Sequence, residues 1–320
     1  MTSLKKLSIA VAIACAGTAT LAADVYPAKP VRVVVTTVPG PLDAFARAVL
    51  QEMQARLKQP FVVDNRPGAG GNVGSDMVAK APADGYTLLF ALDTTFTVNP
   101  SLYEKMPFDP AKDFRIIGVP VTYSQMLGVG PSIQVDSLPD FVKLARAKNL
   151  SYASGGNGSP SHLTMAAFLA SAGLDLVHVP YKGTGASVVD VIGGQVDSLF
   201  AVTSGILPQV KAGKLKALAI SGPQRSVAAP DVPTVAEQGY PGFNASFAYV
   251  LAAPAGTPDS VVQLLARELD EAMKTPRVAE LNRIADYQPI HKTLGAAADW
   301  LSTTRASWSG VITKARITAN

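Results

Sequence analysis

Cysteine is the scarcest reactive residue of this sequence: Cys15 is the only one, and it lies within the first 23 residues. A mature chain without that segment has neither a disulfide framework nor a cysteine nucleophile. Histidine is nearly as rare, and the spacing of His162, His178 and His291 is not that of a metal site. Charged residues make up 16% of the chain, without a basic run or an aromatic stacking platform, which argues against a nucleic-acid partner. We therefore expect neither a metal nor a cofactor.

Residues 1–23 have the zones of a secretory signal peptide. Two lysines at positions 5 and 6 precede an apolar run, and the small-residue end Leu21-Ala22-Ala23 precedes Asp24. The apolar run is too short to span a membrane. We predict cleavage near Ala22 or Ala23 and an exported mature protein. Lipid attachment at Cys15 is the alternative, although the preceding Ala12-Ile13-Ala14 lacks the usual leucine.

Short β-branched runs alternate with amphipathic helices along the mature chain. This alternation predicts an α/β fold with mainly parallel sheets and helices on both faces. The expected strands are Val31–Thr37, Phe61–Asp64, Tyr86–Ala91, Ile116–Val121, Met126–Val129, Ser151–Ser154, Leu176–Val179, Ser198–Val202, Ala217–Ser221 and Tyr249–Ala252. Between the first two, apolar residues from Leu42 to Leu57 recur at helical spacing and predict a helix with one buried face.

The domain organisation follows from the last two predicted helices. One begins at Thr257-Pro258 and the other surrounds Trp300 and Trp308, and neither has a sheet of its own. We expect them to pack back onto the first domain. This predicts a first lobe of residues 24–123 plus 249–320 and a second lobe of residues 124–248, about 100 or more residues each. A ligand would bind at the carboxyl ends of the strands, in a cleft between the lobes.

Two of the predicted strands end in a loop of glycine, proline and hydroxyl residues that opens a helix. Such loops leave backbone N–H groups unpaired at the positive end of a helix dipole, where an anion can be held without a charged side chain. Two of them facing each other would form a clamp. The candidate ligand-binding residues in these loops are Pro39, Gly40, Pro41, Leu42, Asp43, Ser154, Gly156, Asn157, Gly158, Ser159 and His162.

Several of these candidates have a structural alternative. A glycine-rich strand-to-helix turn needs the same residues for conformational reasons alone. The Asp43 carboxylate would compete with an anionic ligand for the positive field at the helix N-terminus. A role as a cap or an interlobe tether is therefore the alternative to ligand contact. A lone histidine in the position of His162 is more often a buried core residue than a ligand contact. Ser159 beside His162 raises the alternative of a hydrolase, but neither a G-x-S-x-G elbow nor an acid placed to orient the histidine accompanies them.

Two further segments contain hydroxyl residues near strand ends. Thr94 follows a predicted strand and is a cleft candidate. Thr184 lies in Lys182-Gly183-Thr184-Gly185, which would form either another small anion nest or a plain strand-to-helix turn. The glycines of residues 68–74 have neither of the nucleotide-binding spacings, so we interpret that segment as a tight turn.

The chain resembles the Bug-type periplasmic solute receptors of the tripartite tricarboxylate transporter family over nearly its whole mature length. Asp197, at the end of one matching motif, joins the candidate ligand-binding residues. The matching motifs are Tyr26-Pro27-Ala28-Lys29-Pro30, Asn65-Arg66-Pro67-Gly68-Ala69-Gly70-Gly71-Asn72, Asp84-Gly85-Tyr86-Thr87-Leu88-Leu89, Asn99-Pro100-Ser101-Leu102-Tyr103, Tyr152-Ala153-Ser154, His178-Val179-Pro180-Tyr181-Lys182-Gly183, Gly193-Gly194-Gln195-Val196-Asp197, Asp231-Val232-Pro233-Thr234 and Ala253-Pro254-Ala255-Gly256-Thr257-Pro258.

The resemblance implies a two-lobed periplasmic binding protein of type II-like architecture that closes on a small aliphatic or aromatic carboxylate. It further implies a monomer that delivers its ligand to the membrane subunits of a tripartite transporter. A sensor input that delivers its ligand to a signalling protein is an alternative of a different class. The family's usual P-P-G-G appears here as Val38-Pro39-Gly40-Pro41, and its W-x-G as Ala248-Tyr249-Val250, so the cleft wall is altered.

Overall fold

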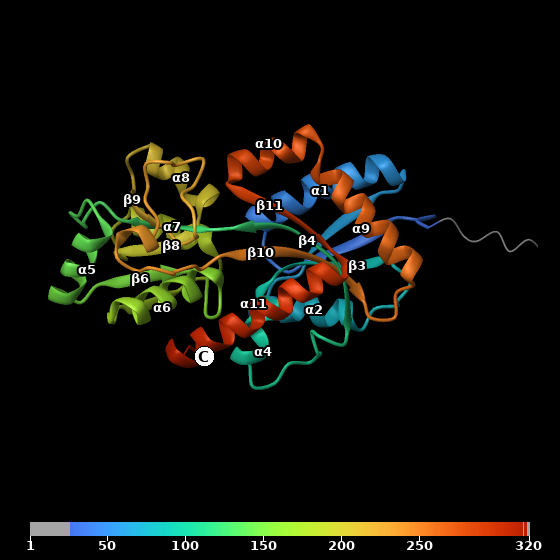
Figure 1. Cartoon of the computed structure of the whole chain (residues 1–320), viewed down its shortest axis with the longest axis horizontal. Coiled ribbons are helices and arrows are strands. Elements are labelled where there is room, and N and C mark those ends of the chain that lie inside the picture. The colour runs from blue at the N-terminus through green and yellow to red at the C-terminus, as the bar shows by residue number, and fades with distance from the viewer. Residues whose placement is uncertain (1–25, 316, 319–320) are drawn as a thin grey trace, which may run out of the picture.

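The computed structural model describes residues 26–315 and 317–318. The predicted signal peptide, its cleavage site and Cys15 lie outside these residues. The described chain forms an α/β fold of two lobes side by side, each a helix-flanked sheet, joined by long strands that run from one to the other (Figure 1). None of the helices in the described ranges is both long and apolar enough to cross a membrane.

The first lobe is built on a six-stranded sheet in the order β11-β4-β10-β3-β1-β2. Its strands are β1 (Val31–Val35), β2 (Phe61–Asn65), β3 (Thr87–Leu92), β4 (Phe114–Tyr123), β10 (Phe247–Pro254) and β11 (Tyr287–Thr293). Its helices are α1 (Pro41–Leu57), α2 (Asn72–Ala79), α3 (Thr94–Thr97), α4 (Asn99–Leu102), α9 (Asp259–Met273), α10 (Pro276–Ala285) and α11 (Leu294–Ala315), with the 3₁₀ turn η1 (Ala69–Gly71).

The second lobe is built on a five-stranded sheet in the order β7-β6-β8-β5-β9. Its strands are β5 (Gln125–Val129), β6 (Ser151–Ser154), β7 (Val177–Pro180), β8 (Ser198–Val202) and β9 (Lys216–Ile220). Its helices are α5 (Leu138–Ala147), α6 (Pro160–Ala172), α7 (Thr184–Ile192) and α8 (Thr203–Lys211), with the 3₁₀ turn η2 (Ala236–Gln238).

Alternation along each strand sends apolar side chains to both faces of both sheets. In β1, Val33 and Val35 pack with α1 and α9, whereas Val34 packs with α2 and α11 on the opposite face. The apolar face predicted for α1 is present, and Phe45 and Met53 are fully buried in it. In the second lobe α5 and α6 cover one face and α7 and α8 the other. The helices therefore cover both faces of both sheets, as the sequence predicts.

The prediction of mainly parallel sheets is wrong. Both sheets are mixed, with four parallel and five antiparallel strand pairs among the described strands. The reason is the passage between lobes: β5 follows β4 after a single residue, so it enters the second sheet without a crossover helix and pairs antiparallel with β8 and β9. β10 then returns and pairs antiparallel with β3 and β4.

All ten expected strands are present, but the sequence did not reveal β11. This edge strand contains Pro289 and polar residues, and it pairs with β4 across a register shift between Pro289 and Lys292. Proline is tolerated on an edge strand because its missing N–H leaves no ladder partner unpaired. The strand therefore lacks the alternating apolar pattern on which the prediction depends.

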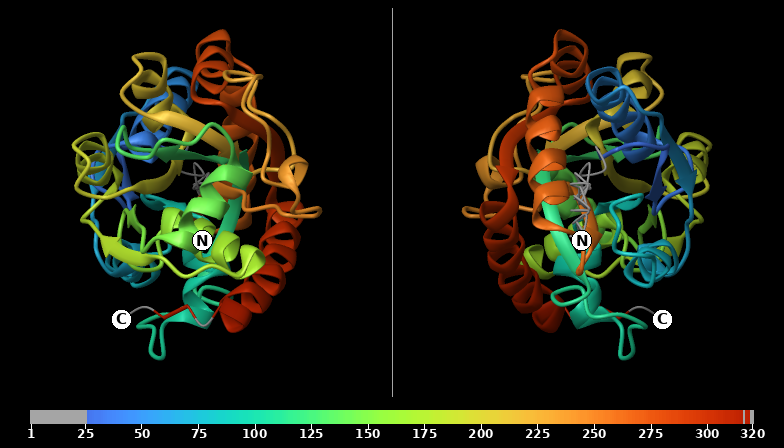
Figure 2. Two further views of the ribbon diagram at one scale, coloured as in Figure 1. Left: turned by 90° about the vertical axis from the view of Figure 1, so that its left-hand side faces the viewer. Right: turned by 90° about the vertical axis from the view of Figure 1, so that its right-hand side faces the viewer.

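The C-terminal helix α11 links the two lobes. It packs on β4 and β11 of the first sheet and also contacts α6 of the second lobe (Figures 1 and 2). Near its end, the Trp308 ring stacks on Phe247 with 5.0 Å between centroids. The expectation that the last helices pack back onto the first domain is confirmed for α9 and α11, and α11 extends further than expected.

The two segments that cross between the lobes are held together by one serine. The Ser221 hydroxyl accepts from the Gln125 amide at 2.8 Å and donates to the Ala245 carbonyl at 2.7 Å. The backbone of Ser221 also exchanges bonds with Gln125 and Ala245. Beside it, Gly222 is packed so closely that an added Cβ would overlap the Ser124 hydroxyl and lie 3.0 Å from Ser124 Cβ. Glycine at 222 therefore allows the crossing strands to approach each other.

We predict that Gly222→Ala lowers the free energy of unfolding by about 1 to 3 kcal/mol through overpacking at this crossing. Adding Ser124→Gly should recover part of the loss, because the two positions are coupled by contact. Urea denaturation of both variants measures the effect. Gly310→Ala is the matched control: it adds a methyl group within α11 where nothing lies within 4 Å, and we expect it to stabilise by about 0.5 to 1 kcal/mol. Equal stability of Gly222→Ala and the wild type would contradict the prediction.

Candidate functional site

A cavity of about 830 Å³ lies between the lobes, and we call it the interlobe cleft. Both lobes contribute to its wall, through the ends of β1, β3, β4 and β8, the loops after β6 and β7, and the starts of α1, α6, α7 and α8. The lining residues are Thr37, Val38, Pro39, Gly40, Pro41, Leu42, Leu92, Tyr123, Gln125, Gly155, Ser159, Pro160, Ser161, Lys182, Gly183, Thr184, Gly185, Ala186, Val188, Val189, Ile192, Val202, Gly205, Gln209, Lys214 and Tyr249.

Four helices have their N-termini at this cleft. The caps of α1 and α7 are Gly40 and Gly183, and neither helix has a side-chain cap bond, nor does α8. The first hydrogen bond of α1 runs from the Ala44 amide to Gly40, so the amides of Leu42 and Asp43 have no intrahelical partner. Only in α6 does a side chain, that of Ser159, accept from a first-turn amide. The dipoles of these helices therefore give the cleft a positive electrostatic field.

The loops of the two lobes face each other across the cleft. A Cβ added at Gly183 would lie 3.5 Å from Val38 Cγ2, which belongs to the loop between β1 and α1. Within the second lobe, the Gly183 amide donates to the Gly155 carbonyl at 3.2 Å. The starts of α1, α6 and α7 are thus brought to one place, as the predicted clamp requires.

Two lysines also line the cleft, and the sequence reading did not include them in the site. Lys182 precedes α7, and Lys214 follows α8. Neither forms an ion pair within the described part of the chain. Lys182 lies two residues before the candidate Thr184, whereas Lys214 is 32 residues after Lys182 and only the fold brings it there. Both add positive charge to the mouth of the cleft.

The rest of the wall is mostly apolar. Val38, Leu42 and Leu92 come from the first lobe, and Val188 and Ile192 come from α7. Two tyrosine rings complete the first-lobe side, Tyr123 and Tyr249, whose centroids are 4.9 Å apart. The cleft therefore combines an anion-attracting end with apolar walls, which suits a ligand of mixed character.

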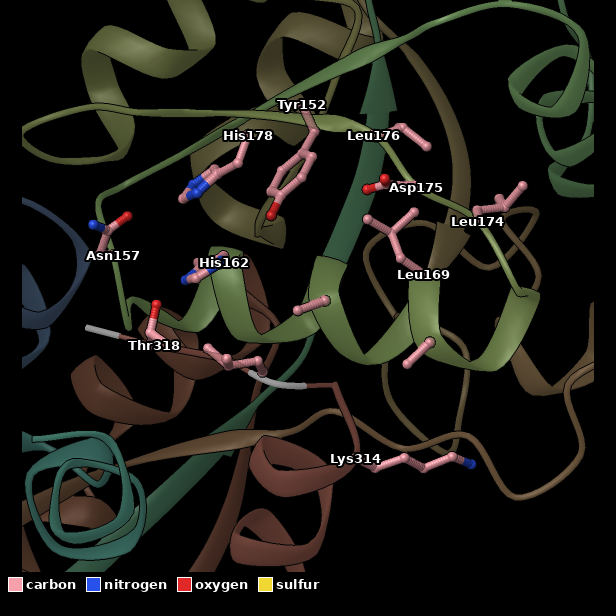
Figure 3. A pocket seen from close by; sticks show the side chains of 13 residues that line it. Tyr152, Asn157, His162, Leu169, Leu174, Asp175, Leu176, His178, Lys314 and Thr318 are labelled. Atoms are coloured by element: carbon pink, nitrogen blue, oxygen red, sulfur yellow. The ribbon is translucent and has the colours of Figure 1, made fainter. Parts of the chain in front are cut away.

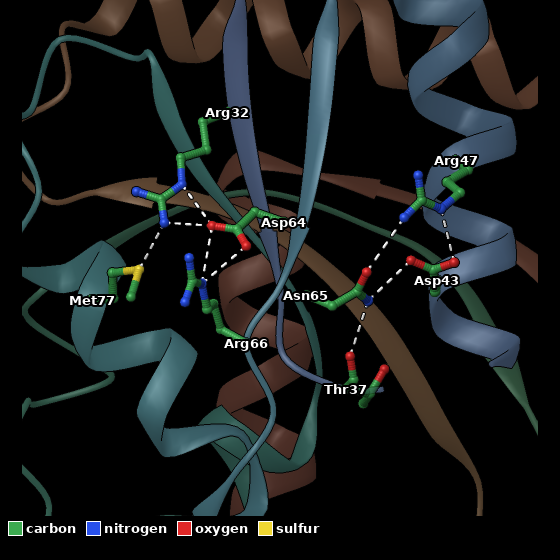
Figure 4. A network of polar contacts seen from close by, with 8 residues as sticks. All are labelled: Arg32, Thr37, Asp43, Arg47, Asp64, Asn65, Arg66 and Met77. Atoms are coloured by element: carbon green, nitrogen blue, oxygen red, sulfur yellow. Dashed lines mark hydrogen bonds and ion pairs between the residues drawn. The ribbon is translucent and has the colours of Figure 1, made fainter. Parts of the chain in front are cut away.

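Asp43 does not line the cleft. Its carboxylate accepts from Arg47 Nε at 2.8 Å and from Asn65 Nδ2 at 3.0 Å, and Asn65 also donates to the Thr37 carbonyl (Figure 4). Burial alone would raise the pKa of Asp43, but these hydrogen bonds and the Arg47 charge lower it below its ordinary value. The residue ties α1 to the end of β2 within one lobe, so it is neither an interlobe tether nor a side-chain cap.

The same figure shows a second ion-pair group on this edge of the first lobe. Asp64 accepts from Arg32 Nε at 2.9 Å and from Arg66 Nε at 3.1 Å, and Arg32 lies against the Met77 sulfur (Figure 4). The pKa of Asp64 is lowered by these arginines, against the effect of burial. Since none of the four residues lines the cleft, this group supports the strand ends and not the ligand.

The glycine-serine loop uses most of its polar groups internally. The Gly156 amide donates to Ser154 Oγ, and the Gly158 amide donates to His162 Nδ1 at 3.0 Å. The Gly155 amide donates to Ser161 Oγ. Ser154, Gly156, Asn157 and Gly158 therefore lie behind the cleft wall, which this loop forms through Gly155 and Ser159.

His162 and Asn157 border a second cavity of about 410 Å³ between α6, β7 and the chain end (Figure 3). There the rings of Tyr152, His178 and His162 form one stack, with 4.7 Å and 4.2 Å between successive centroids. Burial, and secondarily the neighbouring His178, lowers the pKa of His162 to about 4. His162 is 9% exposed, in keeping with the core alternative of the sequence analysis.

Ser159 and the His162 ring do not form the pair that the hydrolase alternative requires. Ser159 Oγ accepts from the backbone amide of His162 at 3.4 Å and lies 3.0 Å from Ser161 Oγ. The His162 ring instead accepts from the Gly158 amide. A histidine whose Nδ1 is occupied by an amide donor and whose ring does not touch the serine cannot take the serine proton in this arrangement.

Of the other candidates, Thr184 lies in the cleft wall, whereas Thr94 and Asp197 do not. Thr94 is buried at the start of α3. Asp197 accepts from the Ser151 amide at 2.7 Å and from the Ser151 hydroxyl at 2.8 Å, so it ties β6 to the start of β8. Among the residues that the structure describes, no group of three or more histidine, cysteine or acidic side chains could hold a metal ion.

Such a cleft between two mixed α/β lobes defines a solute-binding protein, and the comparisons agree. Residues 45–317 match the family model described as "Tripartite tricarboxylate transporter family receptor". BugT of Bordetella pertussis is 35% identical over 309 residues, which cover 95% of each chain. The chain belongs to this receptor family, a family of solute-binding proteins and not of enzymes.

Two solved structures show the likeness in three dimensions. A Rhodopseudomonas palustris protein solved with adipate is 29% identical, with a TM-score of 0.86, and covers 92% of this chain and 99% of its own. MatC of the same organism, solved with bound malate, is also 29% identical, with a TM-score of 0.83 over 90% of this chain and 100% of its own. The family resemblance and the two-lobed periplasmic-binding-protein fold are both confirmed.

We predict that neutral His162 makes stability depend on pH. Because its pKa is about 4 in the folded protein and 6.5 in its ordinary state, the unfolded chain binds a proton first as the pH falls. The contribution is fully present above pH 6.5 and is lost between pH 6.5 and 4, by up to about 3 kcal/mol. Urea denaturation across this range measures it. His162→Gln should make the profile shallower without flattening it, because burial also lowers the pKa of His178 and gives a loss of the same sign. A wild-type profile that is flat from pH 6.5 to 4 would contradict this.

Proposed function

We propose that this protein captures a small carboxylate in the interlobe cleft and delivers it to a tripartite transporter. The observation that carries the proposal is the convergence of uncapped helix N-termini, those of α1, α7 and α8, on one cavity. Unpaired N–H groups at such ends bind anions without needing a charged side chain. The relatives solved with adipate and malate support a carboxylate as the anion.

The helix N-termini of both lobes can donate charge-assisted hydrogen bonds to a carboxylate. Charge-assisted hydrogen bonds contribute roughly 1.5 to 3 kcal/mol each, and three or four are available from the two lobes. Association and ordering cost about 4 to 15 kcal/mol, so burial of the apolar part of the ligand against the cleft wall has to add to these bonds. Closure follows if the ligand touches both lobes, since only then does it favour the closed state.

We propose that residues 24–123 plus 249–320 form one of the two bodies that close and residues 124–248 the other. The crossing at Ser221 and Gly222, where two segments pass between them, is the natural place for the hinge. Val38 and Gly183, already near each other across the cleft, would then come into contact first.

We extend the proposal to the location and partners of the mature protein. The zones of residues 1–23 support export to the periplasm, and the family description supports membrane subunits of a tripartite transporter as partners. The mature receptor would act as a monomer, without a cofactor. Delivery to a signalling protein uses the same cleft and would show as a sensor partner in place of transporter subunits. The hydrolase alternative is not proposed, because Ser159 and the His162 ring are not bonded.

We predict that Thr184→Asp abolishes or greatly weakens carboxylate binding. Thr184 is the first residue of α7 and lines the cleft, so an acidic side chain there places a negative charge in the anion-binding field. Because acidic residues stabilise helix N-termini by about 0.3 to 1 kcal/mol, the fold should remain intact. Isothermal titration with adipate and malate should show an affinity loss of about tenfold or more.

Thr184→Asn is the matched control for that experiment. It has nearly the same shape as aspartate without the charge, so its affinity should stay within about threefold of the wild type. Thermal unfolding of both variants confirms that they are folded. A Thr184→Asp protein that is folded and binds these acids as tightly as the wild type would refute an anion site at the start of α7.

We predict that the exported protein begins near Asp24. Expression of the full chain in a Gram-negative host, osmotic shock and intact-mass measurement test this. The expected species lacks residues 1–22 or 1–23 and is found in the shock fluid. A lipid-modified species that begins at Cys15 and stays with the membrane would show that lipid attachment is the correct alternative.

A further inference from the structure

One buried side-chain oxygen in the wall of the cleft, Gln125 Oε1, has no hydrogen-bond partner among the described residues. Gln125 lies at the start of β5, directly after the chain crosses from the first lobe. Its backbone is fixed by Ser221 through bonds in both directions, each of 2.8 Å, and it pairs with Val202 in β8. The position of the residue is therefore set by the fold, not by its own side chain.

The side-chain oxygen of Gln125 is unsatisfied within the described protein. The residue is 3% exposed, and its Oε1 is buried without a hydrogen bond, which is true of no other side-chain atom among the cleft-lining residues. Leaving a buried polar atom unpaired costs about 1 to 3 kcal/mol. A ligand in the cleft that hydrogen-bonds to the Gln125 amide would remove this cost.

The surroundings of Gln125 restrict the chemistry of that partner. Tyr123, two residues earlier, lies on the same side of the extended chain and packs on Tyr249, which pairs with Leu92. Val202 lies beside Gln125 on the neighbouring strand. An amide among rings and aliphatic side chains cannot neutralise a second carboxylate, whose desolvation would be uncompensated. A neutral group that both donates and accepts, such as a hydroxyl, matches either orientation of the amide.

We propose that Gln125 determines specificity by binding a neutral hydroxyl group on the apolar body of the bound acid. The preferred ligands are therefore hydroxy-substituted aromatic or medium-chain carboxylates. This inference rests on the proposed function, because the helix N-termini hold the carboxylate while Gln125 binds the other end. The two tyrosines and the valines along the cleft enclose the apolar part between them.

Isothermal titration of the mature protein tests the proposal with matched pairs of acids. The pairs are benzoate with para- and meta-hydroxybenzoate, and hexanoate with omega-hydroxyhexanoate, and adipate is the diacid. We expect at least one hydroxy acid to bind about tenfold or more tightly than its parent. In Gln125→Leu this preference should fall to about threefold or less, while the parent acid binds as well as before or better.

Gln209→Leu is the matched control variant. Gln209 is also a glutamine that lines the cleft, but it is half-buried on α8 and can be hydrated. Its replacement should leave the hydroxyl preference unchanged. Thermal unfolding of each variant verifies the fold before titration.

The outcomes separate this inference from the proposed function. If hydroxy acids and their parents bind the wild type equally, or if Gln125→Leu keeps the preference, the role of Gln125 is refuted and carboxylate capture stands. If adipate binds and no monocarboxylate does, the second group is acidic and the inference is also overturned. If none of these acids binds the folded wild type, carboxylate capture itself fails.

Discussion

The protein depends on one electrostatic arrangement: helix N-termini that are left open at a shared cleft. The helices α1, α6, α7 and α8 follow β1, β6, β7 and β8, and these four strands have their carboxyl ends on the side that faces the other lobe. Their first-turn amides cannot be satisfied within the helix. Because Gly40 and Gly183 provide no capping side chain, water or an anion must take that role. Binding is in this sense a consequence of the topology, and the side chains only adjust it.

The fold was largely readable from the sequence because its strands are apolar and short, and its helices have clear faces. The direction in which the strands pair could not be predicted from the sequence. It depends on where the chain passes between the lobes and not on any local pattern. β4 and β5 look like any two strands, but the single residue between them forces an antiparallel entry into the second sheet. The edge strand β11 was not predicted. An edge strand does not need alternating apolar residues, and it can contain a proline such as Pro289.

The loops that contribute backbone groups to the candidate site could be predicted from the sequence. The side chains that come from distant segments could not. The loops at Gly40, Ser159 and Thr184 line the cleft, and each has glycine or proline next to the start of a helix, which is a local pattern in the sequence. Lys214 and Gln125 carry no such signal, because each is an ordinary residue in its local sequence. Asp43 shows the opposite error: a charged residue in the right loop is turned away from the cleft and bonded to Arg47 and Asn65.

The two lobes do not contribute equally to the anion site. Three of the four helix N-termini, and both cleft lysines, belong to the second lobe, whereas the first lobe offers the start of α1 alone. There Pro41 has no N–H to give, so Leu42 and Asp43 hold the free amides of that turn. The positive field of the open cleft is therefore strongest on the second lobe. In the closure that we propose, an anion held by the second lobe gains the donors of α1, and this added contact favours the closed state.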